Sequence, residues 1–185
     1  MPWRGIAFVA ASGVLFLVSW RALTRPRSHG FPRFFAWEAI VALFLLNVEH
    51  WFEDPLVWHQ LVAWTLLGAC LVPAVWGSVL LARRGKPARS RGEADPALLA
   101  FEKTSRLVTS GIYRYIRHPL YSSLLLLAWG IFFKRPSLAG GALAVAASGL
   151  LVWTALADEA ECVGVFGDEY RQYMRRTTRF IPFVV

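Results

Sequence analysis

The chain has 185 residues, of which 56% are hydrophobic and 17% are charged. Soluble domains average about 45–50% apolar and about 25% charged residues. This composition excludes a disordered protein, a coiled coil and a disulfide scaffold, and it argues against an ordinary water-soluble enzyme. The net charge is +8, from 20 Lys and Arg against 12 Asp and Glu. Because the basic residues lie between long apolar runs and no nucleic-acid-binding module accompanies them, we expect a membrane protein with no nucleic-acid partner.

Five apolar segments are long enough, or nearly long enough, to cross a membrane, which takes about 20 residues in a helix. We therefore predict an all-α, polytopic membrane protein of about five transmembrane helices, forming a single domain over residues 1–185. The fourth segment is the shortest, and small residues make the fifth suitable for close helix packing. In chain order the segments are 5–23, 34–52, 57–82, 119–133 and 137–157.

The charges of the loops predict how the segments are oriented. The first loop carries four arginines (Arg21, Arg25, Arg27, Arg33) and no acid, and the second carries three acids and no basic residue. The third loop, residues 83–117, carries nine basic and three acidic residues. Cytoplasmic loops are enriched in Lys and Arg, so we expect loops one and three and the C-terminal part in the cytoplasm. The basic third loop also suits contact with anionic lipid headgroups, although topology alone explains its charge.

Two polar stretches flank the last predicted helical hairpin, residues 109–121 before it and residues 158–173 after it. Both should therefore lie at the same end of the bundle. The first stretch offers Arg114, Arg117 and His118, and the second offers Asp158, Glu159 and Glu161. Such an arrangement suits a zwitterionic ligand at the membrane surface. An interhelical salt-bridge network that merely closes the bundle explains the same residues.

A second polar cluster lies around the second loop and allows two interpretations. Imidazole and carboxylate groups bind several divalent metals, so the cluster could form a metal site. An aromatic belt at the membrane interface with solvated acids explains the same residues, and we predict no metal. The cluster consists of His50, Glu53, Asp54 and His59.

The two polar stretches also carry two motifs that resemble those of a known family. The first has the pattern Gly-x-Tyr-x-x-x-Arg-His-Pro-x-Tyr, formed by Gly111, Tyr113, Arg117, His118, Pro119 and Tyr121. The second is an acidic pair followed by an aromatic tail, formed by Asp158, Glu159, Phe166, Gly167, Tyr170, Tyr173, Arg179, Ile181 and Pro182. Together they resemble the isoprenylcysteine carboxyl methyltransferase and phospholipid methyltransferase superfamily of integral membrane enzymes. The resemblance covers roughly residues 100–185.

The resemblance implies S-adenosylmethionine as methyl donor, bound at the cytoplasmic end of the bundle. It implies a cofactor site formed by Tyr113, Arg117, His118, Pro119, Tyr121 and Glu159. Arg117 and Glu159 are also the expected catalytic residues. Arg117 would orient a carboxylate acceptor, with Arg114 as second choice, and Glu159 would be the base for an amine acceptor. A guanidinium or imidazolium group can pair with the donor's carboxylate, and a carboxylate with its ammonium.

The acceptor is left open by the sequence. Residues 1–82 show no resemblance and would shape the acceptor side of the protein. The expected acceptor is a lipophilic or lipid substrate: the carboxylate of an isoprenylated cysteine, a phospholipid amine or a small thiol. The alternative is a non-catalytic membrane transporter or sensor for a small molecule. Nothing in the sequence predicts the oligomeric state.

Overall fold

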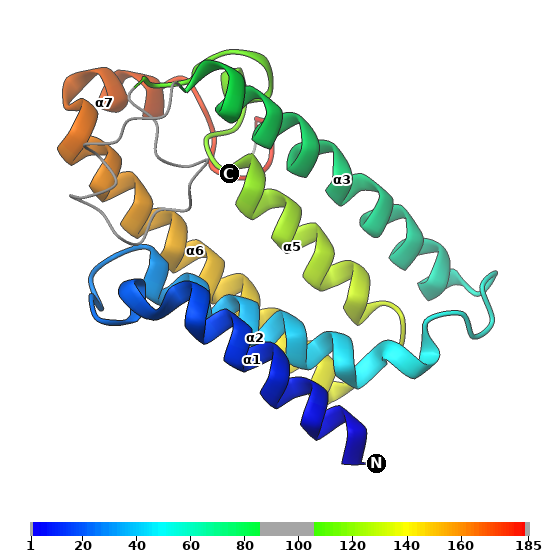
Figure 1. The fold of residues 1–185 in the computed structure, drawn as a ribbon. Coiled ribbons are helices and arrows are strands. Elements are labelled where there is room, and N and C mark those ends of the chain that lie inside the picture. Colours follow the sequence, from blue (N-terminus) through cyan, green and yellow to red (C-terminus); the bar gives the residue numbers. More distant parts are fainter. Residues whose placement is uncertain (1, 86–105, 184–185) are drawn as a thin grey trace.

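The computed structural model describes residues 2–85 and 106–183 and is all-helical over that part of the chain (Figure 1). The basic residues between 86 and 105, for which lipid contact is predicted, lie outside the described residues. The long helices are α1 (Pro2–Leu23), α2 (Gly30–Asn47), α3 (Trp58–Arg84), α5 (Pro119–Phe132) and α6 (Leu138–Phe166). The short elements are η1 (Val48–His50), η2 (Gly111–Arg114) and α7 (Asp168–Met174).

Four of these helices, α1, α2, α3 and α6, are long and apolar enough to cross a membrane, and α5 is a shorter apolar helix. The protein is thus a polytopic all-α membrane protein, as the sequence predicts. Its outer surface fits this environment, because large apolar side chains such as Val9 and Leu17 are exposed, at 71% and 77%. Exposed apolar surface of this extent is unfavourable in water and favourable against lipid.

The prediction for the last apolar segment is wrong at its end, because α6 continues to Phe166 instead of ending at 157. Asp158 and Glu159 interrupt the apolar run, but neither residue breaks a helix. The helix ends only at Gly167, which adopts a positive φ of 57°. Positive φ costs glycine little, which makes it a common helix terminator. Consequently the acidic pair lies on a helix and projects from a rigid element.

Helix α5 lies at the centre of the fold, with α3 packed on one side and α6 and α2 on the other. Two glycines allow the close approach of α3 and α5. A Cβ atom on Gly77 would lie 3.0 Å from Pro119, and one on Gly130 would lie 2.9 Å from Leu67. Figure 1 shows that α5 and α6 splay apart toward the end that carries α7. The candidate functional site lies at this wider end.

At the narrower end of the bundle, a core of small and branched residues joins α2, α5 and α6. Alanines of α6 pack there against larger side chains of the other two helices, as the small residues of this segment predict. The core consists of Ile40, Leu43, Ala128, Ile131, Ala144 and Ala147.

Lys134, a basic residue in the outer turn of the predicted topology, is held inside the protein rather than in solvent. Its side chain is 1% exposed, and Nζ donates to the Trp51 carbonyl at 3.1 Å and to Gln60 Oε1 at 3.0 Å. Nζ also lies 3.1 Å from the centre of the Trp64 ring, a cation–π contact. The lysine therefore ties the α5–α6 turn to α3 and to the segment after η1.

We expect Lys134→Met to lower the free energy of unfolding, because it leaves the Trp51 carbonyl and the Gln60 amide oxygen buried without this donor. Each unsatisfied buried acceptor costs about 1–3 kcal/mol. Thermal unfolding in detergent micelles measures the effect, and Arg135→Met, at the exposed neighbouring position, is the matched control. Equal melting temperatures for the two variants would contradict the role of Lys134.

The predicted alternative metal cluster is not brought together by the fold. His50 Nδ1 lies 2.6 Å from Glu53 Oε2, whereas His59 Nδ1 contacts the Phe133 carbonyl at 2.9 Å. Within residues 2–85 and 106–183, the one set of three ligand-type side chains with atoms close enough for an ion is elsewhere, at the opposite end of α2.

Candidate functional site

The C-terminal segment forms part of the site by pairing with the residues before α5. Arg117 N donates to the Thr178 carbonyl at 2.8 Å, and His118 N donates to the Arg179 carbonyl at 3.1 Å. Thr178 N donates in return to the Tyr115 carbonyl at 3.1 Å. The two motifs identified in the sequence are therefore joined by backbone hydrogen bonds.

Pro119 sets the conformation of the residue before it. The proline occupies the first turn of α5, and His118 has φ −121° and ψ 61°, outside the helical region. A proline disfavours helical backbone in the preceding residue, so the non-helical approach to α5 is explained by the sequence. It leaves the backbone N–H of His118 available to the C-terminal segment.

Glu159 is buried and bound by two arginines. Its Oε1 accepts from Arg117 Nε at 2.9 Å and from Arg179 Nε at 3.0 Å, and its Oε2 accepts from Arg179 Nη2 at 3.2 Å. The side chains of Arg117 and Glu159 are 8% and 5% exposed. Hydrogen bonds to ionised groups in such surroundings are stronger than those between neutral groups. Glu159 thus anchors both motifs to α6.

Arg117 also binds the segment that follows α7. Its Nη1 donates to the Met174 carbonyl at 3.2 Å and to the Thr177 carbonyl. Together with the Glu159 contact, these bonds place the guanidinium between α6 and the C-terminal segment. The interhelical salt-bridge network that the sequence allowed is therefore present, with Arg117 at its centre.

His118 lies between the two carboxylates of the acidic pair. Its Nδ1 is 3.5 Å from Asp158 Oδ2, and its Nε2 is 3.4 Å from Glu159 Oε1. Burial alone would lower the pKa of His118, but the hydrogen bonds and charges of Asp158 and Glu159 outweigh it and raise the pKa. The ring stacks on Tyr121 with centroids 5.3 Å apart, which fixes its plane.

A cavity opens beside these residues. One wall is polar and includes both basic and acidic groups, and the other is aliphatic and aromatic. The described lining residues are His29, Leu81, Arg106, Leu107, Val108, Tyr113, Arg117, His118, Pro119, Leu120, Tyr121, Asp158, Cys162, Phe166, Tyr170 and Tyr173.

Most of the residues predicted from the sequence meet at this cavity, but two do not. Five of the six predicted cofactor-site residues line it: Tyr113, Arg117, His118, Pro119 and Tyr121. Glu159 is not among the lining residues, and its neighbour Asp158 is. Arg114 is exposed on η2 and is not among them either. Asp158 Oδ2 lies 3.4 Å from the Tyr121 hydroxyl, which donates to it.

Two tyrosines of α7 contribute phenol groups to the wall. Burial is the main cause that raises the pKa of Tyr170 and of Tyr173, so both phenols stay protonated. The Tyr173 hydroxyl donates to the Tyr113 carbonyl at 2.7 Å. This bond ties α7 to η2 across the cavity.

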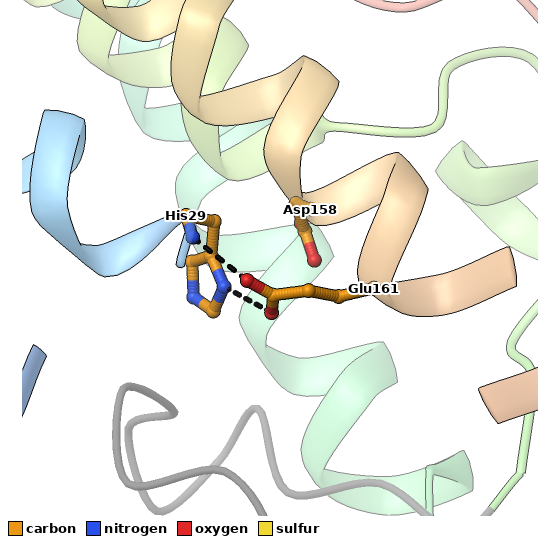
Figure 2. A group of neighbouring side chains, drawn as sticks. All are labelled: His29, Asp158 and Glu161. Atoms are coloured by element: carbon orange, nitrogen blue, oxygen red, sulfur yellow. Dashed lines mark hydrogen bonds and ion pairs between the residues drawn. The ribbon is translucent and has the colours of Figure 1, made fainter. Parts of the chain in front are cut away.

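His29 is a cavity residue that sequence reasoning missed. It precedes α2 and is 132 residues from Glu161 in the chain, yet Figure 2 shows the two side chains facing each other. His29 N donates to Glu161 Oε1 at 2.8 Å, and His29 Nδ1 is 2.6 Å from Glu161 Oε2. Its sequence signal was weak: a single histidine in an arginine-rich loop, and a glutamate one helical turn after Asp158.

His29, Asp158 and Glu161 each offer one ligand-type atom, and these atoms lie within 4.8 Å of one another. The same side chains also fit a hydrogen-bonded ion pair. Arg33 Nη1 lies 3.5 Å from His29 Nε2, so a guanidinium already stands beside the group. A positive neighbour disfavours a divalent cation and favours the hydrogen-bonded pair.

Comparison with known proteins confirms the predicted resemblance. Residues 90–169 match the family model of phospholipid methyltransferases. Methanethiol S-methyltransferase 1 of Bradyrhizobium diazoefficiens is 32% identical over 80 residues, which cover 42% of this chain and 27% of that protein. Protein-S-isoprenylcysteine O-methyltransferase of Schizosaccharomyces pombe is 33% identical over 87 residues, which cover 44% of this chain and 35% of that protein. No solved structure matches the chain.

The fold is that of a polytopic all-α membrane protein, and the part of the chain that includes α5 and α6 is similar to methyltransferases. The match to the phospholipid methyltransferase model, over residues 90–169, and the two named relatives agree with the superfamily that the two motifs resemble. The alignments span only about a third of the length of these curated relatives.

Proposed function

We propose that this protein transfers a methyl group from S-adenosylmethionine to a lipophilic acceptor at the cytoplasmic face of the membrane. The observation that carries the proposal is the cavity lined by Tyr113, Arg117, His118, Pro119 and Tyr121, with the Asp158 carboxylate on its wall. These are residues of the two motifs shared with the methyltransferase superfamily. The names of the two relatives, one acting on a thiol and one on an isoprenylcysteine, support methyl transfer.

The charged and aromatic groups of the cavity wall fit the chemistry of the donor. The Asp158 carboxylate is suited to the donor's ammonium group, and His118, whose pKa is raised, is suited to its carboxylate. The tyrosine rings of the wall suit the adenine or the sulfonium. When bound, the donor supplies an electrophilic methyl group on a positively charged sulfur.

The protein's own contribution is positioning and exclusion of water. Methyl transfer to a nucleophile needs the reacting atoms aligned, and fixed dipoles and charges do this without reorganisation. Arg117 and Glu159 hold the walls of the cavity in place through their buried pair. We keep Arg117, which lines the cavity, as the proposed orienting cation for an acceptor. Glu159 is proposed to act through Arg117 and His118, because its carboxylate is taken up by them.

The proposed orientation rests on the charge of the wider end of the bundle. Arg83, Arg84 and Arg106 lie near this end, which is the end predicted to face the cytoplasm. The donor is a polar nucleoside of the cytoplasm, so the cavity would open on the correct side. The helices before residue 82 are proposed to form the acceptor side.

Binding of S-adenosylhomocysteine to the detergent-purified chain tests the proposal by calorimetry. We expect saturable binding that Asp158→Asn weakens by about 10- to 100-fold, because a charge-assisted hydrogen bond contributes about 1.5–3 kcal/mol. Asp168→Asn is the matched control, since its side chain is 84% exposed on α7 and outside the cavity lining. Absence of binding by folded wild-type protein would refute the proposed function and favour a transporter or sensor.

A further inference from the structure

The proposed reaction raises the question of which group takes the proton of the acceptor. A carboxylate acceptor is already a nucleophile, whereas a thiol or an amine must lose a proton to attack the methyl group. The base must therefore lie on the cavity wall, within reach of the acceptor. The need for such a base rests on the proposed function.

Most ionisable groups of the described cavity wall are unsuited to this task. The arginines stay charged at all accessible pH values, and the raised pKa of Tyr170 and Tyr173 keeps these phenols protonated. Both ring nitrogens of His118 face carboxylates, so that ring already holds its protons. Glu159 is bound by Arg117 and Arg179, as described above.

Asp158 and Cys162 are occupied as well. The Asp158 carboxylate accepts from the Tyr121 hydroxyl and lies beside His118, and the Cys162 thiol donates to Asp158 Oδ1 at 3.6 Å. A carboxylate surrounded by donors is a weak base. The remaining described wall residue with a nitrogen lone pair is His29.

His29 has the geometry of an oriented base. Glu161 is bound to its Nδ1 at 2.6 Å and to its backbone N–H at 2.8 Å, so both the ring and the loop that carries it are fixed. A carboxylate on Nδ1 favours the tautomer with the proton there and makes Nε2 the accepting nitrogen, which Arg33 Nη1 approaches only to 3.5 Å. The side chain is 1% exposed to solvent, so bulk water does not compete for this nitrogen.

Charged groups on α2 and α6 have opposite effects on the pKa of the His29 ring. Burial lowers the pKa of His29, the hydrogen bond of Glu161 and the charge of Asp158 raise it, Arg33 lowers it, and the net shift is upward. A base stronger than free histidine is suited to a thiol, whose pKa is about 8.5 in cysteine. An ammonium group has a pKa of about 10.4 in lysine, so a histidine is a much poorer base for an amine acceptor than for a thiol.

We propose that His29 is the general base of the proposed methyl transfer and that the acceptor is a lipophilic thiol. The S–H bond breaks and its proton passes to His29 Nε2. The electron pair left on the sulfur forms the new S–CH₃ bond, and the donor's C–S bond breaks with its pair remaining on the donor sulfur. The aliphatic wall formed by Leu81, Leu107 and Leu120 suits the hydrocarbon part of such a thiol.

Two acceptors distinguish this proposal from a structural role of His29. The full chain in detergent is given labelled S-adenosylmethionine with 1-hexanethiol or with S-farnesyl-N-acetylcysteine, whose acceptor is a carboxylate. We expect His29→Gln to lower kcat for the thiol by at least about 100-fold. Turnover of a carboxylate acceptor should fall far less than turnover of the thiol, because a carboxylate has no proton to lose. His50→Gln, at the other end of α2, is the matched control.

The pH profile gives a second readout that does not depend on His29→Gln folding. Protonated His29 cannot accept a proton, so kcat/KM for the thiol should fall as the pH drops through the pKa of His29. Glu161→Gln removes the charge that raises this pKa and should move the fall to lower pH. A profile of Glu161→Gln that coincides with that of the wild type would overturn the assignment.

The outcomes distinguish failure of the His29 inference from failure of the proposed function. Undiminished thiol turnover by His29→Gln, or wild-type protein that binds S-adenosylhomocysteine but methylates no thiol, overturns the inference and leaves the proposed function standing. Loss of thiol turnover on treatment with a chelator also overturns it, in favour of a metal ion held by His29, Asp158 and Glu161. Wild-type protein that does not bind S-adenosylhomocysteine overturns the proposed function itself.

Discussion

Glu159→Ala is expected to lower the free energy of unfolding by about 3–5 kcal/mol, the usual cost of removing one partner of a buried ion pair. The substitution leaves the buried Arg117 guanidinium without its carboxylate partner and removes one of the two carboxylates beside His118. Arg179 adds less to the loss because its side chain is 33% exposed and water can solvate it. The melting temperature in detergent micelles should fall on the order of 10 °C.

Two further variants test whether the loss of stability in Glu159→Ala comes from the unpaired Arg117 guanidinium. Glu169→Ala, an exposed position on α7, should leave the melting temperature nearly unchanged. The double variant Arg117→Met with Glu159→Leu should be more stable than Glu159→Ala, because the guanidinium left without its partner, that of Arg179, is partly solvated. A double variant less stable than Glu159→Ala would contradict this account of the pair.

Gly111→Ala is expected to destabilise the protein by about 2–5 kcal/mol, from a backbone cost of about 1–2 and an overpacking cost of about 1–3 kcal/mol. Gly111 has a φ of +63°, where side chains are strained. A Cβ atom there would overlap Leu80 Cδ1, so the Leu80 side chain or η2 must shift. Because Leu80 packs against the cluster that contains Tyr113, this shift disturbs the cavity wall and should weaken binding of S-adenosylhomocysteine.

Thermal unfolding and calorimetry measure the two effects of Gly111→Ala. Gly164→Ala is the matched control, because a Cβ atom at this helical position meets nothing within 4 Å. It should be neutral or stabilising by up to about 1 kcal/mol, the difference between Gly and Ala in a helix. If Gly111→Ala and Gly164→Ala had the same melting temperature, positive φ and the contact with Leu80 would not explain why residue 111 is glycine.

The sequence predicted those features that depend on local pattern. Apolar runs predicted the helices, and Pro119 predicted the non-helical residue before α5. The two motifs predicted which end of the bundle carries the cavity. The end of α6 was misjudged because polarity, rather than a helix-breaking residue, was taken as its boundary at 157.

The partners of individual side chains depend on contacts between distant parts of the chain. His29 and Glu161 are separated by 132 residues, and Arg117 and Glu159 by 42. No periodicity encodes such pairs, because each depends on the angle at which the helices splay. For the same reason the sequence favoured Glu159 as a cavity residue, whereas the turn of α6 presents Asp158 to the cavity instead.

The hydrogen bonds between residues 115–118 and 178–179 have a consequence for biosynthesis. The spanning helices can enter the membrane one after another while the ribosome is still translating. The cavity wall cannot close until Thr178 and Arg179 have left the ribosomal exit tunnel. A chain arrested before these residues would be inserted but incomplete at its wider end, with Glu159 lacking one of its two arginines.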